Sequence, residues 1–131
     1  MTYHPLFADH LEHPRNVGDL PEPSVIVKQH NPACGDQLRL SLKIEDSVIK
    51  QAGIKAYGCP QTLAAASAMS ELIRGRNTVD ALRISRQEIA DAIGGLPRNK
   101  MHAAALALDA LVTAIKKYNQ TNIEPAAAEN R

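Results

Sequence analysis

The sequence contains few aromatic residues, only two cysteines and almost no net charge. Tryptophan is absent and aromatic residues make up 3% of the 131 residues, which argues against a surface that stacks nucleic-acid bases. Basic and acidic residues nearly balance, at a net charge of +1, so we expect no nucleic-acid or anionic-membrane footprint. No apolar run approaches the length that spans a bilayer. The length suits one domain with its own core.

The N-terminal segment also lacks the basic and then apolar pattern of a secretion signal, so we expect a cytoplasmic protein with no membrane partner. The cysteines, Cys34 and Cys59, could form one disulfide by number alone. In a reducing compartment, a metal-binding or thiol role is more common for such a pair.

Residues 25 to 57 show the period of two that is typical of β-strands. Residues 25–27 begin one strand, residues 37–45 form a second and residues 48–57 a third, with a turn at residues 45–47. Gly53 is expected to form a bulge in the third strand. The apolar positions of the second strand alternate strictly with polar ones, at Leu38, Leu40, Leu42 and Ile44. Because short loops join the strands, the sheet should be antiparallel.

Helical patterns surround this region. We expect a short helix over residues 4–12, a second from Pro60 to Gly75, a third from the Ser85 capping box to residues 94–95, and a long one after Pro97. The long helix should bury a stripe of Met101, Leu108, Leu111, Val112 and Ile115. Strands followed by helices indicate an α+β fold, a three-stranded antiparallel sheet with helices packed on one face. The domain should span residues 1–123, and residues 124–131 should form a flexible tail.

Both cysteines fall where the backbone must turn. Cys34 precedes Gly35, which permits a sharp turn, and Asp36 at i+2 should point to the same side in an extended segment. Cys59 precedes Pro60 and should therefore lie at a helix N-terminus, where free N–H groups and the helix dipole favour a thiolate.

His102 should lie in the first turns of the last long helix, near Lys100, a cation that would stabilise a nearby thiolate. Two sulfurs, one nitrogen and one oxygen can complete a tetrahedral zinc site or hold iron. The metal-binding set predicted from the sequence is therefore Cys34, Asp36, Cys59 and His102.

Four stretches of the chain resemble the IscU/NifU N-terminal-type iron–sulfur cluster assembly scaffolds, in the order in which that family has them, over roughly residues 3 to 119. They are His13-Pro14-Arg15-Asn16-Val17-Gly18, Asn31-Pro32-Ala33-Cys34-Gly35-Asp36, Tyr57-Gly58-Cys59-Pro60, and Leu96-Pro97 with Lys100-Met101-His102. The resemblance implies an IscU/SufE-like fold with a cluster or zinc site at one end. The ligands or close neighbours of that site would be Cys34, Asp36, Cys59 and His102.

The resemblance also implies a non-enzymatic scaffold or carrier that holds a [2Fe-2S] cluster, iron or zinc. Its partners would be a cysteine desulfurase that supplies sulfur and the apoproteins or carriers that receive the cluster. Arg98-Asn99 stands where the family's chaperone-binding motif has Pro-Val, so recognition by an Hsp70-type chaperone is left open.

The chain departs from the family pattern at Ala103, where the family normally has a third cysteine that accepts sulfur from the desulfurase. A naturally divergent paralogue and a Cys→Ala variant would both show this residue. One alternative is therefore a degenerate scaffold that acts as a zinc-stabilised interaction or regulatory module. Another is a thiol enzyme using Cys34 and Cys59, which would require a base or a resolving thiol at short range.

Overall fold

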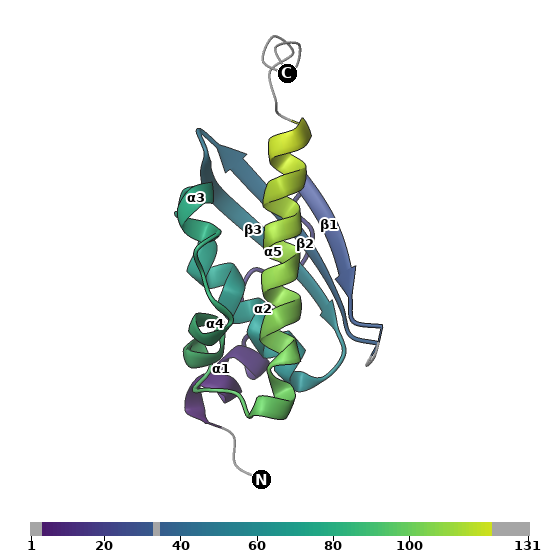
Figure 1. Ribbon diagram of the computed structural model, residues 1–131, viewed down its shortest axis with the longest axis vertical. Helices are drawn as coiled ribbons and strands as arrows, with labels where there is room; N and C mark the ends of the chain where they lie inside the picture. Colours follow the sequence, from purple (N-terminus) through teal and green to yellow (C-terminus); the bar gives the residue numbers. More distant parts are fainter. Residues whose placement is uncertain (1–3, 33–34, 122–131) are drawn as a thin grey trace.

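The structure is a computed structural model that describes residues 4–32 and 35–121 (Figure 1). A three-stranded antiparallel sheet in the order β1-β2-β3 is covered on one face by the helices, which confirms the predicted fold. The predicted tail, residues 124–131, lies outside the described residues, as does Cys34. In chain order the elements are α1 (Pro5–Glu12), β1 (Val25–His30), β2 (Gln37–Glu45), β3 (Val48–Tyr57), α2 (Pro60–Ile73), α3 (Thr78–Ala81), α4 (Arg86–Ala92), the 3-10 turn η1 (Arg98–Lys100) and α5 (His102–Thr121).

The β2–β3 hairpin has the predicted bounds, but the prediction of a bulge at Gly53 is wrong. The register shift lies between Lys43 and Ile44, and Gly53 pairs in register with Ser41. Gly53 instead allows the segment after α1 to cross the sheet closely. A Cβ at this position would lie 2.3 Å from the carbonyl oxygen of Gly18 and 2.7 Å from Ser41 Oγ. Steric room, and not irregular pairing, therefore accounts for this glycine.

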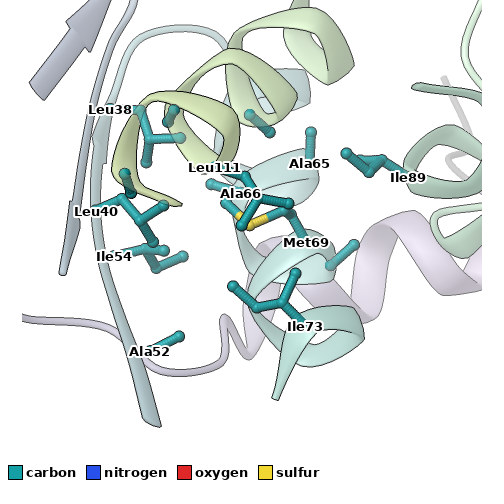
Figure 2. Packing of buried hydrophobic residues seen from close by; sticks show 14 of the residues in the cluster. Leu38, Leu40, Ala52, Ile54, Ala65, Ala66, Met69, Ile73, Ile89 and Leu111 are labelled. Atoms are coloured by element: carbon teal, nitrogen blue, oxygen red, sulfur yellow. The ribbon is translucent and has the colours of Figure 1, made fainter. Parts of the chain in front are cut away.

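The core lies between the sheet and the helix pair α2 and α5. All four alternating apolar residues of β2 are buried, and Figure 2 shows Met69 of α2 and Leu111 of α5 facing the sheet residues Leu40 and Ile54. One face of each strand therefore contributes to the core, as the period of two requires.

The buried stripe of α5 consists mainly of small residues. Of the predicted residues, Leu111 and Ile115 are fully buried, whereas Met101, Leu108 and Val112 are half-buried. The alanines that fill the stripe bring α5 close to the equally alanine-rich α2, because interaxial distance depends on the side chains at the contact. The buried residues are Ala103, Ala104, Leu106, Ala107, Ala110, Leu111, Ala114 and Ile115. Although α5 has 20 residues, neither it nor another helix in the described part is apolar enough over a sufficient length to cross a membrane.

The N-terminal segment is attached to α2 through polar contacts. The buried side chain of His10 pairs through Nδ1 with Ser67 Oγ at 2.8 Å, and this hydroxyl also accepts the backbone N–H of Arg15 at 2.9 Å. His10 Nε2 lies 3.5 Å from Glu71 Oε1. These contacts place the segment that includes residues 13–18 along α2, with its parallel bridge from Val17 to β3.

Burial lowers the pKa of His10, and the nearby Arg15 cation adds to the effect against the opposing carboxylates of Glu71 and Asp9. The native imidazole thus stays neutral at a pH where the unfolded chain already binds a proton. Stability from this group is complete above about pH 6.5, the unfolded value, and is lost as the pH falls from there toward the native pKa.

We therefore expect the free energy of unfolding, measured by urea titration, to fall between about pH 8 and about pH 5.5, and His10→Gln to reduce that fall. His13→Gln, which replaces an exposed histidine at the end of the same helix, should leave this fall in the free energy of unfolding unchanged. An equal fall in both variants would contradict the assignment to His10.

Candidate metal centre

The register of β2 and β3 brings Asp36 and Cys59 together. Gln37 and Tyr57 form the last pair of the hairpin, so the residue before β2 lies opposite the residues that follow β3. Gly58 permits this approach, because a Cβ there would lie 2.1 Å from Asp36 Oδ1. Cys59 is the N-cap residue of α2 and Pro60 occupies the first helical position, as predicted.

The Asp36 carboxylate is buried, with 4% of the residue exposed, and is held by hydrogen bonds from the start of α2. Its Oδ1 accepts the backbone N–H of Cys59 at 3.2 Å. Its Oδ2 accepts the hydroxyl of Thr62 at 2.6 Å and the Cys59 thiol at 3.2 Å. Cys59 makes no side-chain cap of its own, so a carboxylate from the neighbouring strand satisfies the N-cap amide of the helix.

His102 completes the cluster from a third element. It is the first residue of α5, whose start lies at the same end of the fold as the start of α2 (Figure 1). Its Nε2 lies 3.7 Å from Asp36 Oδ2 and 3.9 Å from Cys59 Sγ. The His102 side chain is 30% exposed, against 6% for Asp36, so the cluster is open to solvent on the His102 side.

The spacing of Asp36, Cys59 and His102 suits a single tetrahedral ion. Their ligand atoms all lie within 4.8 Å of one another. Ligands at about 2.0–2.3 Å from an ion at the centre of a tetrahedron are separated by about 3.3–3.7 Å, roughly 1.6 times the bond length. The observed separations of 3.2, 3.7 and 3.9 Å lie around that range. Thiolate, imidazole and carboxylate together form a donor set that fits zinc and iron.

The same geometry argues against a thiol enzyme built on Cys59. In a catalytic triad, one imidazole nitrogen faces the nucleophile while the carboxylate holds the other nitrogen. Here Asp36 and Cys59 both approach the Nε2 atom of His102. The carboxylate therefore does not orient the imidazole as a base, and the three groups converge on a common point instead.

Three further residues were predicted to form or support the site, namely Cys34, Gly35 and Lys100. Cys34 lies outside the described residues, so its convergence with Cys59 stays a prediction. Gly35 has a φ of 78° and donates its N–H to the Asn31 carbonyl at 2.8 Å, which confirms the sharp turn before Asp36. The prediction of an extended backbone here is wrong at Gly35, because its φ is positive. Lys100 is half-buried in η1, and its supporting role stays a prediction.

Ala103, the position of the family's third cysteine, is fully buried among the core residues.

The site also includes Thr62, which was not among the residues predicted from the sequence. Its hydroxyl lies between the Asp36 carboxylate and the Cys59 sulfur, at 2.6 and 3.3 Å. The sequence signal for Thr62 is weak, because a threonine three residues after an N-cap position does not by itself indicate a metal site.

The chain is similar to known proteins in sequence and in fold. The model of the family described as "NifU-like N terminal domain" matches residues 2–125. An iron-sulfur cluster assembly scaffold protein IscU from Archaeoglobus fulgidus is 38% identical over 114 residues, covering 87% of this chain and 74% of that protein. The IscU scaffold protein of Aquifex aeolicus is 35% identical over 129 residues, covering 95% and 82%. The NifU-like N-terminal structure from Brucella abortus matches the fold with a TM-score of 0.71 at 19% identity, covering 89% and 94%.

The close approach at Gly58 generates a prediction for metal binding. Gly58→Ala should displace the Asp36 carboxylate and weaken the affinity for Zn²⁺ or Co²⁺ by about tenfold or more, the range seen when groups that orient ligands are disturbed. Gly75→Ala is the matched control, since Gly75 also has a positive φ, of 85°, but an added Cβ there meets nothing within 4 Å. Equal affinities in the two variants, measured by chelator competition, would contradict the role given to Gly58.

Proposed function

The chain belongs to the NifU-like N-terminal domain family, and we propose from this premise that it is a scaffold on which an iron–sulfur cluster is assembled and from which it is passed on. The cluster is the cargo of the protein and not a resident cofactor. The relatives from Archaeoglobus fulgidus and Aquifex aeolicus are themselves named as scaffold proteins, and we propose that this chain likewise holds its cargo without catalysing a reaction of its own.

The observation that carries the proposal is the convergence of Asp36, Cys59 and His102 at one end of the fold, open to solvent on one side. A structural zinc site normally has four protein ligands, mostly cysteine and histidine, and no open coordination position. A site with one buried carboxylate and an exposed imidazole suits cargo that must leave again. Carboxylate oxygen is a harder donor than thiolate and is not the preferred ligand of the soft iron–sulfur unit.

We propose Cys34 as the fourth ligand of a [2Fe-2S] cluster. One residue separates Cys34 from Asp36, so the length of the chain allows its sulfur to reach the cluster of Asp36, Cys59 and His102. In this assignment Cys34 and Cys59 supply thiolates, His102 supplies its Nε2 atom and Asp36 supplies one carboxylate oxygen. A cysteine desulfurase would deliver the sulfur, and apoproteins or carriers would receive the finished cluster.

Anaerobic reconstitution tests the proposed function. The purified protein is incubated with Fe²⁺, cysteine, a cysteine desulfurase and a thiol reductant such as dithiothreitol, which supplies the electrons that convert the transferred sulfur to sulfide. It is then separated from small molecules and analysed for iron and acid-labile sulfide. We expect both in equal amounts, and their transfer to an added apo-ferredoxin. Zinc retained through this treatment, without iron or sulfide, would overturn the proposal in favour of the zinc-stabilised module.

The ligand assignment predicts that each of the two hydroxyl-for-thiol substitutions affects the site. Cys34→Ser and Cys59→Ser should each weaken Co²⁺ binding and reduce the thiolate-to-cobalt charge-transfer absorption, because each removes one sulfur from the site. The double variant should lose this absorption altogether. Full charge-transfer intensity in Cys34→Ser would exclude Cys34 from the site and leave Cys59 as its single sulfur.

Position 103 gives a separate prediction about sulfur transfer. Ala103→Cys would place a third sulfur beside His102 at the start of α5, and we expect faster desulfurase-dependent cluster formation than in the unmodified chain. Ala104→Cys is the matched control, because Ala104 is equally buried in the same turn but one residue further on. Equal initial rates for the unmodified chain and Ala103→Cys would show that Cys34 or Cys59 already accepts the sulfur.

A further inference from the structure

Thr62, in the first turn of α2, contacts both Asp36 and Cys59 through its side-chain hydroxyl. It is 1% exposed, and its hydroxyl lies 2.6 Å from Asp36 Oδ2 and 3.3 Å from Cys59 Sγ. Its backbone N–H donates to the Cys59 carbonyl at 3.0 Å, so the helix itself fixes the position of the side chain. The hydroxyl is therefore part of the rigid start of α2 and not of a mobile loop.

The hydrogen-bonding capacity of the groups fixes the direction of these contacts. An ionised carboxylate only accepts, so the single hydroxyl proton of Thr62 is donated to Asp36 Oδ2, and a hydroxyl lone pair faces the sulfur. The Cys59 amide holds the other oxygen, Oδ1. The Cys59 amide and the Thr62 hydroxyl thus hold the carboxylate at both oxygens and fix its plane. Oδ2 also accepts the Cys59 thiol, and because a thiol loses its proton when it binds a metal, that lone pair would become available to an ion placed between Cys59 and His102.

We propose that Thr62 is a positioning residue for the cargo site, which orients the Asp36 carboxylate toward the metal through its hydroxyl. The proposal rests on the proposed function, since it assumes that Asp36 is a ligand. Ligating carboxylates are usually hydrogen-bonded by a second group, and removing such a group typically costs about 10–100-fold in metal affinity. Because the Cys59 amide remains as a second donor, we expect a loss near the lower end, about tenfold.

The test uses Co²⁺ as the probe, with affinity from chelator competition and site geometry from the visible spectrum of the bound ion. Thr62→Val removes the hydroxyl and keeps the shape, and we expect about tenfold weaker Co²⁺ binding and an altered d–d spectrum. Thr62→Ser restores the hydroxyl and should restore both properties. Ser67→Ala, which removes a buried hydroxyl of the same helix at the contact with His10, should lower stability without changing either property.

A double-mutant cycle keeps the proposal testable if Thr62→Val proves poorly folded. In an Asp36→Ala background, replacing Thr62 by Ala or Val should change Co²⁺ affinity little, since the carboxylate that the hydroxyl orients is gone. An equal loss of Co²⁺ affinity in both backgrounds would overturn the proposal. So would a loss in Thr62→Ser, or in Ser67→Ala, as large as the loss in Thr62→Val.

The outcome also separates this inference from the proposed function. If the unmodified protein binds no Co²⁺, the cargo site itself is refuted and the role of Thr62 falls with it. If the unmodified protein binds Co²⁺ and Thr62→Val binds it with the same affinity and spectrum, only the positioning role is refuted.

Discussion

The pairing of Gln37 with Tyr57 is the constraint on which the site depends. It closes the β2–β3 hairpin at the end where the chain turns into α2, and so places Asp36 against Gly58 and Cys59. A shift of one residue in this register would turn the side chains of one strand to the opposite face and separate the carboxylate from the sulfur. The buried alternation of β2 opposes such a shift, so the hydrophobic core and the ligand geometry are fixed by the same pattern.

The Asp36 carboxylate serves two purposes, and hydrogen bonds from the protein compensate for its burial in both. As an acceptor for the Cys59 amide it caps α2, and as a neighbour of Cys59 Sγ and His102 Nε2 it is one of three converging donors. A buried carboxylate is costly unless hydrogen bonds compensate for lost solvation. The protein donors around it meet that cost before cargo arrives, so the site is formed in advance of binding.

Much of the fold follows from local patterns, whereas the site required tertiary information. Strict alternation predicted β2, the capping box at Ser85 predicted the start of α4, and Pro60 predicted the start of α2. The bulge was misplaced because a glycine within a strand indicates either a bulge or a close approach, and only the position of Gly18 decides between them. The four-residue helix α3 is too short for periodicity to reveal. Thr62 was missed because its partner lies 26 positions earlier in the chain.

In the proposed site, sulfur and lighter donor atoms together hold the iron of a transferable cluster. Iron K-edge X-ray absorption on the anaerobically reconstituted protein measures this directly. We expect sulfur scatterers at bridging and thiolate distances together with a nitrogen or oxygen shell from His102 and Asp36, and loss of part of that lighter shell in Asp36→Ala. An iron environment made of sulfur alone, or one unchanged by Asp36→Ala, would contradict this expectation.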